Sequence, residues 1–151
     1  MQLAHYLGLL LQAEHSLSDA FQEVGRAHAA EADVYFICQK LVRQCDEHAE
    51  SLRPFVQRYS EQAPDEPERL HSELFQGSRS GGLGLLRDLQ DLYLMTAECD
   101  ICWVMMGQAA QGARDSELYE VATRCGVETS TQAAWLRTRM KQAAPQALVV
   151  S

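Results

Sequence analysis

Apolar residues recur at alternating spacings of three and four along almost the whole chain, and no stretch alternates with a period of two. This spacing places an apolar stripe along one face of a helix, so it predicts an all-α protein. The stripes predict four long helices, at about residues 3–28, 32–59, 83–110 and 115–143. Because each stripe needs the others to be buried, we expect one domain across residues 1–151.

Two short connections and one long connection separate these helices. The long connection covers residues 61–82, where Pro64, Pro67 and Gly77 punctuate a polar stretch. Short connections make consecutive helices antiparallel, whereas a long one can carry the chain back along a bundle of about 40 Å. The sequence therefore predicts a four-helix bundle whose second and third helices run parallel, with a short helix at residues 65–75 in the crossover.

Residues that favour helix ends support these boundaries. Gly112 is predicted to mark the third connection, and Asp115 or Ser116 to cap the fourth helix. Pro145 is predicted to follow the end of that helix, because proline cannot donate the backbone hydrogen bond that continues it. Pro54 falls inside the second helix, where the same property predicts a kink.

Composition excludes several classes of protein. The chain has 13 basic and 21 acidic residues, and this net charge of −8 makes it a poor partner for nucleic acid or an anionic membrane. The longest apolar stretch, residues 92–106, contains Glu98 and Asp100 and is too short to span a bilayer. The N-terminus lacks the basic region of a signal peptide. We therefore expect a cytoplasmic protein whose five cysteines are reduced thiols.

Polar residues interrupt all four apolar stripes at one predicted height. Residues equidistant from the turn of an antiparallel hairpin lie at the same level, so the residues that interrupt the stripes are expected to converge in the middle of the bundle. The carboxylates and the imidazole among them are Glu14, His48, Asp100 and Glu128, one on each helix. The polar residues within about one turn of these are Cys45, Cys125, Gln132 and Glu98. Glu98 falls on a more polar side of its helix than Asp100, so Asp100 is expected to point inward.

Buried carboxylates need a compensating partner, because taking a bare charge out of water costs several kcal/mol. A divalent metal would compensate the carboxylates, and carboxylate with imidazole is a ligand set suited to Fe, Mn or Zn. We therefore predict a metal site at Glu14, His48, Asp100 and Glu128. Cys45, Cys125, Gln132 and Glu98 would lie beside the ligands or serve as ligands themselves. Hydrogen bonds and raised pKa values are the metal-free alternative.

In helix order and in these residues the chain resembles the ferritin-like superfamily, which includes rubrerythrins and bacterioferritins. The motif of that family is one Glu on each of helices 1 and 3, and Glu-x-x-His on each of helices 2 and 4. Glu14 and His48 match it, and Asp100 stands as a shortened ligand on the third helix. The resemblance implies a ferritin-like fold and the handling of iron, oxygen or peroxide.

The chain departs from that motif at two positions. Cys45 stands where the glutamate of the second helix is expected, and Thr131 stands where a histidine would follow Glu128. In the other alignment, Cys125 and Glu128 take the glutamate and histidine positions of the fourth helix. Either alignment leaves the di-iron motif incomplete, which favours a single ion over a two-iron centre.

Two further function classes remain open. A buried Glu14–His48 pair that fixes the helix register would make the chain a non-catalytic structural or interaction protein that has lost its metal. A thiol-redox protein is the weaker alternative, since Cys99 and Cys102 form a Cys-x-x-Cys motif on a helix with no strand before it. The sequence identifies no substrate.

The third helix carries a second apolar stripe, opposite the one assigned to the core. It consists of Leu94, Ile101 and Met105. Surplus apolar surface of this kind usually meets another subunit. The sequence therefore predicts a homodimer that forms through the outer face of the third helix.

Overall fold

The computed structural model describes residues 2–60 and 75–150, and in these residues it contains four long helices and no strand. The helices are α1 (Leu3–Ala27), α2 (Ala32–Ser60), α3 (Gly81–Gly112) and α4 (Ser116–Leu148). The prediction of an all-α four-helix bundle is confirmed. The short helix expected at residues 65–75 falls almost entirely outside the described residues.

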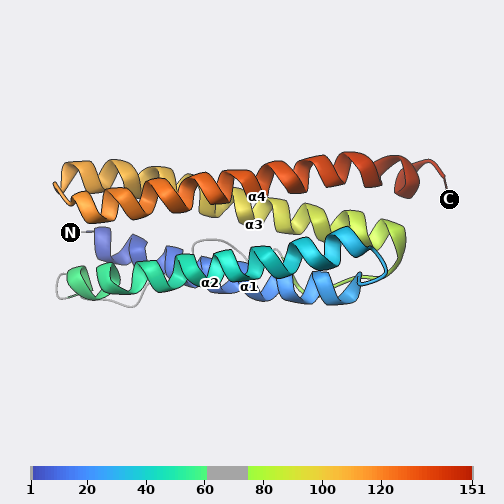
Figure 1. Ribbon diagram of the computed structural model, residues 1–151, viewed down its shortest axis with the longest axis horizontal. Coiled ribbons are helices and arrows are strands. Elements are labelled where there is room, and N and C mark those ends of the chain that lie inside the picture. Colours follow the sequence, from blue (N-terminus) through green and yellow to red (C-terminus); the bar gives the residue numbers. More distant parts are fainter. Residues whose placement is uncertain (1, 61–74, 151) are drawn as a thin grey trace.

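The helices form two antiparallel hairpins laid on each other, α1 with α2 and α3 with α4 (Figure 1). Across the two layers, α1 packs on α3 and α4 packs on α2. Within the described residues, α2 and α3 make no contact, so they occupy opposite corners of the bundle. Figure 1 also shows that α2 and α3 run in the same direction along the long axis.

The core between the four helices is mainly apolar, with a group of buried polar residues in its middle. The stripe predicted for the first helix, at alternating spacings of four and three, is buried throughout. Its residues are Leu3, Leu7, Leu10, Glu14, Leu17, Phe21, Val24 and His28. Among the largest fully buried side chains are Trp103, Phe21 and Leu17. The hairpin of α1 and α2 closes tightly at Gly25, where an added Cβ would lie 2.8 Å from the Cβ of Cys38. Glycine therefore sets the close approach of these two helices.

The turn between α3 and α4 lies where the sequence predicts it. Arg114 takes a left-handed conformation with φ of 56°, and the Asp115 side chain accepts a hydrogen bond from the Leu118 backbone N–H. The predicted N-cap of α4 is therefore Asp115. Tyr59 and Arg58, near the end of α2, donate to the same carboxylate, each at 2.7 Å. Asp115 thus joins α2 to the turn of the second hairpin.

The structure corrects two helix ends. α3 begins at Gly81 and ends at Gly112, so Gly112 closes the helix before the turn begins. α4 continues to Leu148 with Pro145 inside it, so the prediction that Pro145 follows the helix is wrong. Proline removes one backbone donor in the last turn, and the Val149 N–H still reaches the Pro145 carbonyl at 3.0 Å. No described helix is long and apolar enough to cross a membrane.

Candidate functional site

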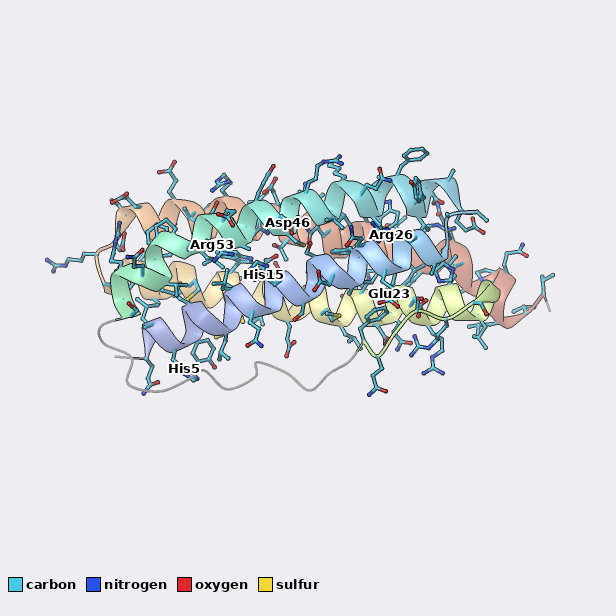
Figure 2. The ribbon with its side chains drawn as sticks, turned by 90° about the horizontal axis from the view of Figure 1, so that it is seen from below. His5, His15, Glu23, Arg26, Asp46 and Arg53 are labelled. Carbon is cyan, nitrogen blue, oxygen red and sulfur yellow. The ribbon has the colours of Figure 1, made fainter. Side chains whose placement is uncertain are left out.

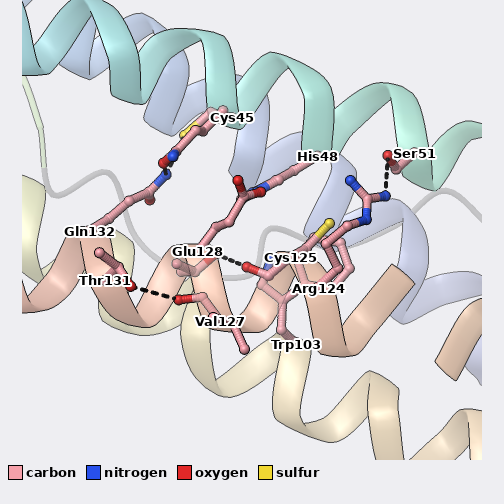
Figure 3. A network of polar contacts seen from close by, with 12 residues as sticks. Cys45, His48, Ser51, Trp103, Arg124, Cys125, Val127, Glu128, Thr131 and Gln132 are labelled. Atoms are coloured by element: carbon pink, nitrogen blue, oxygen red, sulfur yellow. Dashed lines mark hydrogen bonds and ion pairs between the residues drawn. The ribbon is translucent and has the colours of Figure 1, made fainter. Parts of the chain in front are cut away.

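A chain of hydrogen bonds in the middle of the bundle connects all four helices. The His48 imidazole on α2 lies between two carboxylates, with Nδ1 3.3 Å from Glu14 Oε1 on α1 and Nε2 2.9 Å from Glu128 Oε1 on α4. The Trp103 indole on α3 donates its N–H to the same Glu14 oxygen at 2.9 Å. Figure 3 shows Glu128 reaching from α4 toward His48. We call Glu14, His48, Trp103 and Glu128 the central network.

The central network is buried at its centre and open at one end. Glu14 and His48 are fully buried, whereas the Glu128 side chain is 34% exposed. The Trp103 ring also meets the His48 ring edge to face, with centroids 5.8 Å apart. Trp103 therefore contacts both the carboxylate and the imidazole, and Glu128 is the member of the central network that solvent reaches.

The carboxylates on both sides stabilise the charged form of His48. Burial alone would lower the pKa of this imidazole, but hydrogen bonds and charges from Glu14 and Glu128 outweigh burial and raise the pKa above its usual 6.5. A protonated His48 donates one N–H to each carboxylate and neutralises the charge of Glu14. The fully buried glutamate therefore has a compensating charge from within the protein.

Three polar atoms close to the core have no hydrogen-bond partner within the described residues. They are Glu14 Oε2, Thr96 Oγ1 and Gln132 Oε1, and all three are buried. The amide nitrogen of Gln132 donates to Gln44 at 3.0 Å and lies 3.9 Å from the Cys45 sulfur. Gln132 and Cys45 thus form a polar layer beside His48 and Glu128 of the central network (Figure 3).

All five cysteines lie buried as free thiols. Burial is the main cause that raises their pKa values, to about 12 for Cys38 and Cys125 and to about 11 for Cys102. The pKa values of Cys45 and Cys99 rise well above the usual 9.0, through burial and then through the negative charge of Glu14. The thiolate is the nucleophile, and raised pKa values keep these thiols protonated at neutral pH. We therefore expect the cysteines to be unreactive.

The fourth predicted ligand does not join the central network. Asp100 is half-buried and lines an outer groove between α3 and α4, together with Tyr119 and Val127. Burial alone raises the pKa of its carboxyl group. Glu98 is also half-buried, and its charge contributes to the raised pKa values of Cys99 and Cys102. The structure brings together Glu14, His48 and Glu128, and leaves Asp100 at the surface groove.

The central network does not fit a metal ion in its present arrangement. Both ring nitrogens of His48 face carboxylate oxygens at hydrogen-bond distance, so neither presents a free lone pair. In the part of the chain that the structure describes, no three His, Cys, Asp or Glu side chains are arranged to hold one ion. A proton on His48 instead compensates the buried charge of Glu14, whereas the Glu128 carboxylate is partly exposed to solvent.

Sequence reasoning missed two features of the site. The first is the hydrogen bond of Trp103, for which the signal is a tryptophan at the level of a predicted buried glutamate, since a buried indole N–H usually finds an acceptor. The second is a polar cluster at the end of the bundle, where the buried Asp88 accepts from Arg79 at 2.8 Å and contacts His28 at 2.8 Å. The signal for this cluster in the sequence is Asp88 itself, which lies one helical turn from both Leu85 and Leu92. Since these leucines are buried, Asp88 lies on the same buried face.

Comparison of the chain with protein-family models, with curated proteins and with solved structures gave no match. The functional argument therefore rests on the geometry of the site.

Proposed function

We propose that the chain is a non-catalytic bundle of the ferritin-like type, in which the central network takes the place of a metal centre. The observation that carries this proposal is His48, whose two nitrogens are each paired with a carboxylate from a different helix. Together with the indole N–H of Trp103, these bonds tie the four helices at one level. In this interpretation the polar residues hold the register of the helices and perform no chemistry.

The charge balance supports this proposal. A buried carboxylate near a second carboxylate needs a positive partner, and either a metal or a protonated imidazole supplies it. Glu14 and Glu128 raise the pKa of His48, which favours the protonated imidazole. A metal would have to displace that proton and break at least one of the two bonds of His48. The predicted divalent ion, Fe, Mn or Zn, is therefore the second candidate.

Metal content and melting temperature separate the two candidates. Protein purified without chelator is expected to contain much less than one equivalent of Fe, Mn or Zn by elemental analysis. Added Fe(II), Mn(II) or Zn(II) is expected to leave the melting temperature unchanged, because nothing binds the folded state selectively. A rise in melting temperature that His48→Ala abolishes, and that the matched surface variant His15→Ala retains, would establish the metal site instead.

We also propose that the protein works by association, through the outer face of α3. Leu94, Ile101 and Met105 are 42%, 53% and 39% exposed, although they are large and apolar. Val104 extends the same surface toward α4 and is 55% exposed. An exposed stripe of this kind favours a second copy of the chain, as the sequence predicts.

Sedimentation tests this association. The wild-type chain is expected to sediment as a dimer at tens of micromolar, and Ile101→Glu as a monomer with an unchanged helical spectrum. Phe36→Glu is the matched control, since Phe36 is 64% exposed and lies on α2, at the opposite corner of the bundle. A monomeric wild type at this concentration would contradict the proposal.

The thiol-redox alternative has less support. A redox dithiol needs an accessible thiolate, and Cys99 and Cys102 are buried with raised pKa values.

A further inference from the structure

A pocket of about 300 Å³ lies between α1 and α2. Its polar lining consists of Arg26 and Gln22 from α1, and of Arg43, Gln39 and Tyr35 from α2. Figure 2 shows Arg26 on the α2 side of α1, whereas Glu23 lies on the other side of the same helix. The volume is at the small end of the range for ligand pockets, about 300–1,000 Å³.

The charges around this pocket distinguish it from the rest of the molecule. The chain has a net charge of −8, yet the pocket lining contains two arginines and no acidic residue. Within the described residues, the side chains of Arg26 and Arg43 make no hydrogen bond or ion pair, in contrast to Arg58, Arg79 and Arg139. Their guanidinium donors are therefore available to a ligand.

Two acidic residues near the pocket, Asp33 and Asp46, already accept hydrogen bonds. Asp33, whose charge raises the pKa of Cys38, accepts from Arg139 at 2.7 Å. Asp46, one turn beyond Arg43, accepts from the Ser18 hydroxyl at 2.6 Å. Neither carboxylate is bonded to Arg26 or Arg43 in the described residues, so the guanidinium donors of both arginines remain unoccupied there.

The floor of the pocket is apolar and fixed. Phe21, Val42 and the buried Cys38 form it, next to Gly25. Gly25 lets α1 lie close against Cys38 of α2 at this floor, where an added Cβ would lie 2.8 Å from the Cys38 Cβ. The pocket therefore offers an apolar surface beneath two positive groups, which suits a ligand with a short apolar body and an anionic head.

We propose that this pocket binds a small organic anion through Arg26 and Arg43. The head group is a carboxylate or a phosphate, because the planar guanidinium matches both in bidentate geometry. Its apolar part lies on Phe21 and Val42. The net negative charge of the chain disfavours an anionic membrane surface as the source of this head group, so the ligand is a soluble molecule. The proposal does not depend on the central network or on association through α3.

Nuclear magnetic resonance with two anionic probes, benzoate and phenyl phosphate, tests the proposal at constant ionic strength. Both are expected to shift the Gly25 amide and the side-chain signals of Arg26 and Arg43. Arg26→Ala and Arg43→Ala are each expected to weaken binding about tenfold or more, the usual effect of losing a hydrogen bond to a charged group. Both arginines are exposed and have no partner, so the melting temperature should not change.

Three controls keep the test selective. Arg137→Ala removes an exposed arginine of α4 and should bind as the wild type does. Benzyl alcohol has the apolar part without the charge and should not bind at millimolar concentration. Vesicles of phosphatidylcholine with phosphatidic acid distinguish the source of the phosphate, and binding to them that Arg43→Ala abolishes would assign the same head group to a lipid. The proposal would be overturned if the probes left the Gly25 and arginine signals unchanged. It would also be overturned if a variant with both Arg26→Ala and Arg43→Ala bound the probes as tightly as the wild type.

Discussion

His48 is the residue on which the polar interior depends. It accounts for two of the three bonds of the central network, and it carries the only positive charge in that network. Removing it would leave the fully buried Glu14 without a counter-charge, and breaking a buried pair in this way typically costs about 3–5 kcal/mol. Removing the charge of Glu14 is milder, because His48 would still be paired with Glu128.

The raised pKa of His48 makes stability depend on pH. Below pH 6.5 both the folded and the unfolded chain hold the proton, so its stabilisation is complete. Above pH 6.5 the unfolded chain loses the proton first, and the free energy of unfolding should fall by at most about 1.4 kcal/mol per pH unit. Urea titrations from pH 6 to 8.5 measure this slope, which His48→Gln should abolish and His15→Gln should retain. A flat wild-type profile would contradict a charged His48.

The cysteines should be unreactive in the folded protein. Burial keeps all five thiols protonated well above neutral pH. Ellman's reagent at pH 7.5 should therefore modify none of them within minutes, and all five after denaturation. Rapid modification of two thiols in the folded state, lost in Cys99→Ser, would instead support the redox alternative.

Helix α3 differs from the other helices in that most of its surface is apolar. The sequence predicts that the buried stripe of this helix passes through Asp100. The buried residues instead include the neighbouring Cys99, so the stripe is displaced by about one residue. The same stripe includes Leu85, Leu92 and Met106. The displacement explains why Asp100 faces the outer groove and why Asp88 is buried. Where a helix is apolar on nearly every side, only its packing partners decide which side faces the core.

Sequence reasoning placed side chains correctly on the helices whose apolar and polar faces are clearly separated. On α1 and α2 the apolar stripe is flanked by polar residues, and Glu14 and His48 lie where the sequence places them, buried at one level. On α4 the pairing with Glu128 was also predictable from its distance to the turn. The Trp103 hydrogen bond and the pairing of Asp88 with Arg79 and His28 were not, because they depend on how α3 is rotated. The pocket between α1 and α2 depends on the distance between these two helices. The spacing of apolar residues in the sequence does not specify that distance.

Two glycines should respond in opposite ways to the same substitution. Gly25→Ala would place a Cβ 2.8 Å from that of Cys38, so the hairpin must open and stability should drop by about 1–3 kcal/mol. Gly107→Ala meets nothing within 4 Å inside α3 and should stabilise by about 0.5–1 kcal/mol through lower chain entropy. Urea denaturation measures both changes. A destabilising Gly107→Ala with a neutral Gly25→Ala would contradict the packing described for these two helices.

Polar side-chain contacts join the two hairpins at several levels along the molecule, Arg139 with Asp33 among them. Asp88 with Arg79 and His28 joins α1 to α3 at one end, the central network joins all four helices, and Asp115 joins α2 to the second turn. The contacts within each hairpin are more extensive than those between hairpins. The polar bonds between the layers therefore contribute to keeping the hairpins in one cooperative unit.

Unfolding should be a single transition for this reason. In a Trp135→Phe background, the fluorescence of Trp103 reports on the interface between the layers, and circular dichroism reports on all four helices. The two signals should give the same midpoint in urea. In His48→Gln the fluorescence midpoint should come first, because the layers separate before the hairpins unfold. Coincident midpoints in this variant would indicate that apolar packing alone couples the hairpins.

α1 begins at one end of the bundle and α4 ends at the other (Figure 1). A force applied to these two ends would pull the hairpin layers past each other along their length, so that the load falls on the interface between them. The Glu14–Trp103 and His48–Glu128 bonds lie at nearly the same height in that interface and would carry the load side by side. Such a shear geometry resists extension far better than one in which bonds open in succession. The polar residues that we propose hold the helix register would thus also resist extension along the long axis.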